Sequence, residues 1–98
     1  MGGRDRRELK RAVRDAERLR FVERMPFSSA MATNLFEALN AALGAQACRH
    51  NFVLTGRWCE SQSVNVATVI AWLRSEGAGC DCEAFNVEER FTDAMKAF

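Results

Sequence analysis

Two closely spaced pairs of residues in this 98-residue sequence are of the types that bind soft metal ions. One residue separates Cys48 from His50, and one residue separates Cys80 from Cys82. Structural zinc is held by thiolate and imidazole groups, usually four of them in a tetrahedron. The two pairs therefore predict a closed structural zinc site whose ligands are Cys48, His50, Cys80 and Cys82.

The spacing leaves other interpretations of these residues open. Structural zinc sites usually place two or more residues between paired ligands, so the cysteines could be small core residues and His50 an ordinary hydrogen-bonded residue. Cys80 and Cys82 could also form a metal-free thiol redox sensor or enzyme. Cys59 stands outside both pairs and is expected in the core. Because the sequence identifies no third catalytic group beside a Cys nucleophile and His50, catalysis is not predicted.

The expected compartment decides how the cysteines are interpreted. No stretch approaches the roughly 20 apolar residues of a membrane span, and the N-terminal segment is rich in arginine rather than resembling a signal peptide. We therefore expect a cytoplasmic protein with no membrane contact, in a reducing environment that disfavours disulfides. A disulfide between Cys80 and Cys82 would also close a very small, strained loop.

Both ligand pairs are predicted to lie on short strands. Residues 48–54 alternate in character as a strand does, and residues 80–87 form a second, less regular strand candidate. Side chains two residues apart on a strand point to the same face, so antiparallel pairing would bring the four ligands together. Asp81 and Glu83 have the opposite parity, so we expect them to support the ligands from behind or to lie at the surface.

Helical spacing of apolar residues predicts about three to four helices around this pair of strands. The residues expected to begin or end them are Ser28 or Ser29, Gly44, Thr55 and Asn65. The predicted fold class is therefore α+β, a small single domain with a short two-stranded antiparallel β element.

Charge is unevenly distributed along the chain. Residues 1–25 carry nine Lys or Arg against five Asp or Glu, whereas residues 26–98 carry five against eight. We expect a mobile basic helix in residues 1–25 and a globular domain in residues 26–98. The basic helix has a narrow apolar stripe that could pair two chains as a homodimer or dock on its own domain. Its residues are Leu9, Val13, Ala16, Leu19 and Val22.

The basic helix is expected to be solvated or to face a protein partner, with nucleic acid as the alternative. Clustered arginines can neutralise phosphates and release their counterions, although the interspersed acids weaken this interpretation. The candidate contacts are Arg4, Arg6, Arg7, Lys10, Arg11 and Arg14.

The Cys-x-His pair and the run Cys80-Asp81-Cys82-Glu83 resemble the small bacterial proteins of the domain of unknown function 2695 family. The resemblance runs from roughly residue 28 to residue 87. It implies no reaction, substrate or partner, but it places family-like residues at all four predicted ligands and leaves Cys59 outside them. Arg49 stands where the family more often has an acidic residue. We therefore expect a noncatalytic zinc module that binds a partner.

Overall fold

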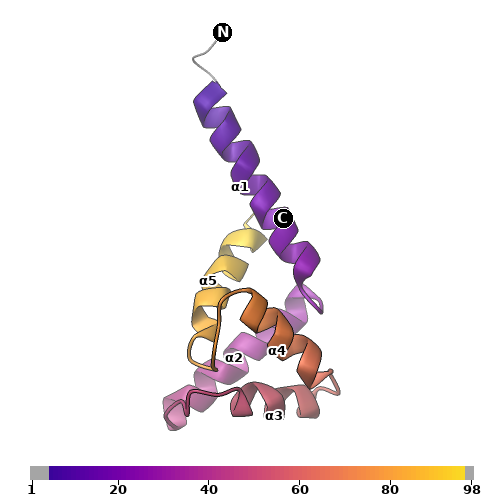
Figure 1. Ribbon diagram of the computed structural model, residues 1–98, viewed down its shortest axis with the longest axis vertical. Coiled ribbons are helices and arrows are strands. Elements are labelled where there is room, and N and C mark those ends of the chain that lie inside the picture. Colours follow the sequence, from indigo (N-terminus) through magenta and orange to yellow (C-terminus); the bar gives the residue numbers. More distant parts are fainter. Residues whose placement is uncertain (1–4, 97–98) are drawn as a thin grey trace.

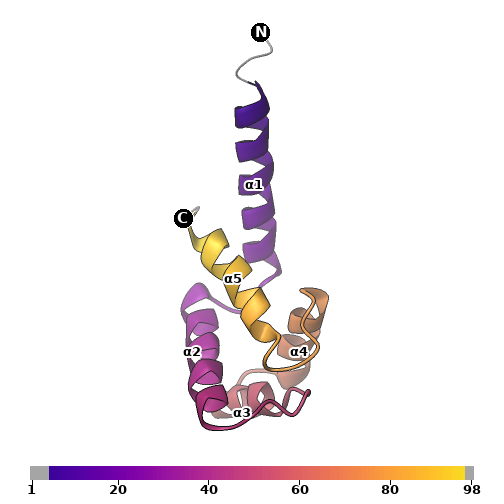
Figure 2. The same ribbon diagram turned by 90° about the vertical axis from the view of Figure 1, so that its left-hand side faces the viewer.

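Five helices make up the part of the chain that the computed structural model describes, residues 5–96. They are α1 (Asp5–Arg24), α2 (Ser29–Ala45), α3 (Val53–Ser61), α4 (Val66–Ser75) and α5 (Ala84–Met95). Helices α2 to α5 pack into a small bundle, and the N-terminal half of α1 projects away from it (Figures 1 and 2). None of these helices combines the length and apolar character needed to span a bilayer.

The predicted α+β fold is wrong, because residues 5–96 contain no strand. His50 lies in a loop with a φ of 60°, a left-handed conformation that interrupts extended chain. The alternation after it comes from the end of this loop and the first turn of α3, where Phe52 is buried and Leu54 half-buried. Residues 80–83 form a turn into α5. A pair of short strands has little stability by itself. In this chain the later residues of both predicted strands belong instead to α3 and α5.

Two predicted helix starts are confirmed. The hydroxyl oxygen of Ser28 accepts a hydrogen bond from the amide of Met31 at 3.2 Å, at the start of α2. The side-chain oxygen of Asn65 accepts one from the amide of Thr68 at 2.9 Å, at the start of α4. Each bond satisfies an amide that has no partner within its helix.

Two other predicted helix ends are wrong, for different reasons. Gly44 lies inside α2, which continues to Ala45 and needs no left-handed residue there. Thr55 lies in the first turn of α3 and is fully buried, so it does not cap the helix. Among the glycines in residues 5–96, the left-handed one is Gly77, with a φ of 100° after α4.

An aromatic cluster fixes the C-terminal half of α1 to the bundle. The ring of Phe21 meets Trp72 edge-on, with 6.0 Å between centroids. Phe27, in the turn after α1, lies edge-on against Trp72 at 5.5 Å and against Trp58 at 5.9 Å. Such edge-on aromatic contacts add to the stabilisation from burying these large side chains.

Ion pairs reinforce the same junction. Arg18 donates two hydrogen bonds to the carboxylate of Asp93 on α5, at 3.0 and 3.1 Å, and this pairing lowers the pKa of Asp93. Arg24 pairs at 2.7 Å with the buried carboxylate of Glu76, which also meets Arg90. The second half of α1 is therefore held by α5 and by the end of α4.

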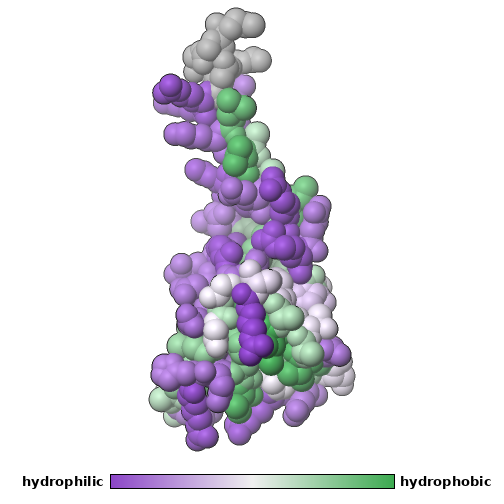
Figure 3. Space-filling model, in the orientation of Figure 1, coloured by the Kyte–Doolittle hydropathy of each residue, from purple (hydrophilic) through white to green (hydrophobic). Residues whose placement is uncertain are grey.

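Most of the apolar stripe of α1 is left uncovered by the described part of the chain, although Val22 at its end packs against the core. Leu9, Val13 and Leu19 are 62, 55 and 47% exposed. In Figure 3, apolar surface on the projecting part of α1 is flanked by hydrophilic surface.

Replacement of Asn65 by alanine should destabilise the protein by about 1 kcal/mol, because the amide of Thr68 loses its side-chain acceptor. Urea denaturation followed by circular dichroism measures this free energy of unfolding. Asn65→Asp keeps an acceptor oxygen and should lie close to the parent protein. Equal losses in both variants would contradict a capping role.

Candidate metal centre

The candidate ligands come from two loops that lie against each other. One loop joins α2 to α3, and the other joins α4 to α5 (Figure 2). A backbone hydrogen bond connects them directly, with the amide of Asp81 donating to the carbonyl of Asn51 at 2.9 Å. The two ligand pairs are thus brought together by a loop contact rather than by the predicted pair of strands.

Three of the four candidates form a group that could hold a metal ion. The ligand atoms of Cys48, His50 and Cys80 all lie within 4.8 Å of one another. The Sγ of Cys82 lies 3.2 Å from the Sγ of Cys80. Cys80 is buried, Cys48 and Cys82 are half-buried, and His50 is exposed. We refer to these four residues as the Cys/His cluster.

The left-handed backbone of His50 contributes to this geometry. With a φ of 60°, His50 turns the chain so that its amide donates to the Sγ of Cys48 at 3.3 Å. Non-glycine residues in this conformation are uncommon and often lie at ligand-binding positions. The Cys-x-His spacing therefore fits a tight loop and does not require a strand.

The thiols of the cluster are hydrogen-bonded to one another and to backbone amides. These bonds shift the pKa values of Cys48 and Cys82 in opposite directions. The backbone amide of Cys82 is the main cause of a lowered pKa at Cys48, with the amide of His50 contributing. Hydrogen bonding to Cys80, and then to Cys48, raises the pKa of Cys82 to about 12. Three adjacent thiolates repel one another, so their joint deprotonation requires a nearby positive charge such as a metal cation.

Asp81 anchors the second loop to the start of α3. Its carboxylate is 1% exposed and accepts hydrogen bonds from the amides of Leu54 and Thr55, both at 3.0 Å. It also accepts one from the hydroxyl of Thr55 at 2.7 Å. These amides lie in the first turn of α3, where Phe52 supplies no side-chain cap. Asp81 therefore caps α3 from a distant part of the chain and holds the two loops in register.

The sequence pattern missed this role of Asp81. A capping residue is normally sought directly before its helix, whereas Asp81 lies 26 positions after Thr55. The available signal was indirect: an acidic residue between two candidate ligands, and an apolar residue, Phe52, directly before the helix.

Glu83 contacts the candidate ligand group, whereas Cys59 does not belong to it. Glu83 accepts a hydrogen bond from the amide of Gly79 at 3.1 Å, and the same oxygen lies 3.7 Å from the Sγ of Cys80. Cys59 is fully buried in the core, as expected, and burial raises its pKa.

The basic residues singled out in the sequence lie far from this centre along the chain, on α1. Four of them line one groove: Arg7, Lys10, Arg11 and Arg14. Arg6 is exposed on the same helix outside that lining. Arg4 lies outside the described residues.

These features define a small helical protein with a candidate metal centre between two loops. The chain belongs to the family described as protein of unknown function DUF2695, whose model matches residues 35–86 and so includes the whole Cys/His cluster. It is 31% identical over 84 residues to the uncharacterized protein Rv2271 of Mycobacterium tuberculosis and to the uncharacterized protein Mb2294 of Mycobacterium bovis. In each case the similarity covers 85% of both chains. No solved structure matches this chain.

Proposed function

We propose that this protein is a noncatalytic helical module that holds a structural zinc ion through Cys48, His50, Cys80 and Cys82 and acts by binding a partner. The observation that carries the proposal is the grouping of the Cys48, His50 and Cys80 ligand atoms within 4.8 Å. Cys82 is the proposed fourth ligand, since its Sγ lies 3.2 Å from that of Cys80. Four protein ligands leave no open position for water, which is typical of a structural site rather than a catalytic one.

The donor types favour zinc over harder cations. Three thiolates and one imidazole are soft or intermediate ligands, whereas magnesium and calcium prefer oxygen. Zinc also matches a four-coordinate set of this composition. The carboxylate of Glu83, which lies 3.7 Å from the Sγ of Cys80, already accepts a hydrogen bond from the amide of Gly79.

The position of the site explains how an ion would stabilise the fold. The cluster joins the α2–α3 loop to the α4–α5 loop, which otherwise meet through the contacts of Asp81. A chain of this size buries a modest core, so a metal bound between two loops adds a substantial share of its stability.

Metal content tests the proposal directly. Native mass spectrometry of protein purified without added metal should show one zinc per chain, and mild acid should release it because the ligands must be deprotonated to bind. Cys48→Ser and Cys80→Ser should lose the zinc. Cys59→Ala is the matched control, since it also removes one cysteine but should keep the metal.

Two further variants test the role of His50. His50→Ala should weaken zinc binding, whereas His50→Cys supplies another zinc ligand and should restore it. Folded parent protein that contains no metal would overturn the proposal. A reversible disulfide within metal-free, folded protein would instead support the thiol redox function.

A further inference from the structure

A basic groove runs along the projecting half of α1. It encloses about 390 Å³, and we define it by its lining residues, Arg7, Lys10, Arg11, Arg14, Asp15 and Arg18. Because this part of α1 extends beyond the bundle (Figures 1 and 2), the groove is accessible to a large ligand.

The acidic residues near the groove neutralise only part of its charge. Asp15 pairs with Arg18 at 3.4 Å, and Arg18 is also bound by Asp93. The four remaining cations of the groove form no ion pair with another described residue. They are Arg7, Lys10, Arg11 and Arg14. The groove therefore keeps a local excess of positive charge although the whole chain is almost neutral.

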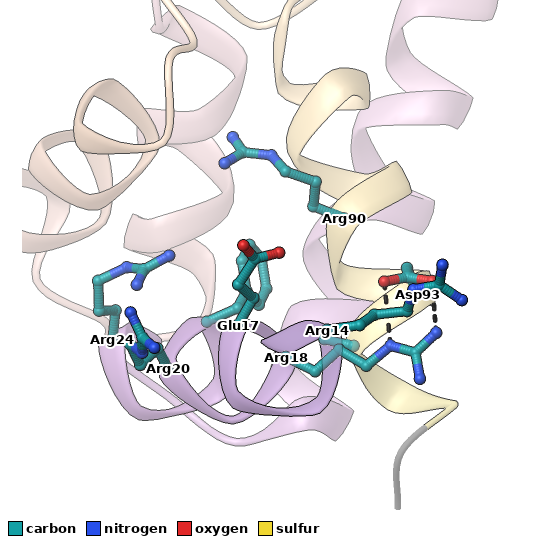
Figure 4. Close-up of a pocket in the computed structure, with 9 residues that line it drawn as sticks. Arg14, Glu17, Arg18, Arg20, Arg24, Arg90 and Asp93 are labelled. Atoms are coloured by element: carbon teal, nitrogen blue, oxygen red, sulfur yellow. Dashed lines mark hydrogen bonds and ion pairs between the residues drawn. The ribbon is translucent and has the colours of Figure 1, made fainter. Parts of the chain in front are cut away.

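The line of arginines continues into a neighbouring pocket between α1 and α5 (Figure 4), which encloses about 260 Å³. Arg20 and Arg24 extend the line toward the end of α1, while Glu17 lies among the arginines of this pocket (Figure 4). From residue 7 to residue 24 the helix rises about 25 Å at 1.5 Å per residue. The basic surface is thus extended along the helix axis, with Asp15 and Glu17 in its middle. Two of its cations, Arg18 and Arg24, are paired with Asp93 and Glu76.

We propose that the basic groove and this pocket bind the phosphate backbone of a nucleic acid. Cations on successive helical turns, about 5 Å apart along the axis, suit a linear ligand with regularly repeated negative charge. Most of them are arginines, whose planar guanidinium matches a phosphate through two hydrogen bonds.

The position of the apolar residues argues against the other anionic partners. A membrane surface would be contacted mainly through Leu9 and Val13, and neither lines the basic groove, so the groove itself would not be the main contact. An acidic helix that packed on the stripe would also need these two residues. The groove offers charge without an apolar anchor, which is how proteins contact a nucleic-acid backbone without reading bases.

Salt dependence provides the main test, on the full chain in its purified state. Fluorescence anisotropy should detect binding to a labelled duplex DNA, and four phosphate contacts predict a slope of log K against log salt of about −3.6. The affinity should then fall roughly 100-fold from about 50 to 200 mM salt. Single-stranded DNA and duplex RNA, measured in parallel, show which nucleic acid is preferred.

Charge variants at exposed positions localise the site. Arg7→Gln and Arg11→Gln should each reduce the slope by about 1. Arg57→Gln on α3 is the matched control, because it removes the same charge outside both surfaces and should leave the slope unchanged. Glu17→Gln removes the acid from the pocket and should tighten binding.

Several results would overturn the proposal. They are the absence of binding at low salt, binding that does not weaken as salt rises, and an equal effect of Arg57→Gln. Equal binding to polyglutamate would indicate an acidic protein partner, and binding only to phosphatidylglycerol vesicles would indicate a membrane. All these measurements are independent of metal content, so they can fail while the zinc proposal holds.

Discussion

Removal of zinc by a chelator should unfold or loosen the protein. Zinc-finger peptides gain about 10 to 16 kcal/mol from metal binding, which is comparable to the whole stability of a small domain. In this chain the ion would fix two loops that carry no regular secondary structure at the cluster, between α2 and α3 and between α4 and α5. Thermal unfolding by circular dichroism, before and after treatment with phenanthroline, should show a large fall in the melting temperature.

Restoration and a matched variant make this result specific. Added zinc should restore the original transition, whereas magnesium should not, because it prefers oxygen ligands. Cys59→Ala should respond to the chelator as the parent does. An unchanged transition in protein shown by mass spectrometry to have lost its zinc would mean that the metal does not hold the fold together.

The helices could be predicted where their signals were local. The apolar spacing of α2 and α4, together with Ser28 and Asn65 before them, marked these helices correctly. Hydrogen bonds over three residues and packing on one helix face depend on residues close in sequence, so a single chain reveals them.

The predicted strands failed because the same local signal has two physical origins. Alternation over seven residues fits a strand, but in residues 48–54 it arises from a left-handed turn at His50 followed by the start of α3. Short alternating runs of this kind do not distinguish the two cases. Nothing in the 29 residues between His50 and Cys80 indicates how the loops approach each other.

The candidate ligands could be predicted because they depend on residue type more than on backbone. Thiol and imidazole groups one residue apart come close in a strand and also in a tight loop. The prediction of a shared site therefore does not require the strands on which it was first placed. The contribution of Asp81 could not be found in the same way, since it depends on a contact between distant loops.

Replacement of Asp81 by alanine should cost about 3 to 4 kcal/mol of unfolding free energy, with or without zinc. The carboxylate is buried and accepts three hydrogen bonds, so its loss leaves the amides of Leu54 and Thr55 and the hydroxyl of Thr55 without this acceptor. Each unsatisfied buried donor costs about 1 to 3 kcal/mol. The negative charge at the start of α3 is lost as well. Chemical denaturation of zinc-loaded protein measures the first value, and denaturation of chelated protein measures the second under conditions in which that protein is still folded.

Two milder variants separate the parts of this contact. Thr55→Val removes the hydroxyl bond and keeps both amide bonds, so it should cost about 1 kcal/mol. Asp81→Asn keeps one acceptor oxygen and should fall between Thr55→Val and Asp81→Ala. If Asp81→Ala destabilised only the zinc-loaded protein, Asp81 would act through the metal ligands. An equal loss in both states would mean that Asp81 joins the two loops before the metal binds. The entropy cost of ordering the loops would then not reduce the affinity for the ion.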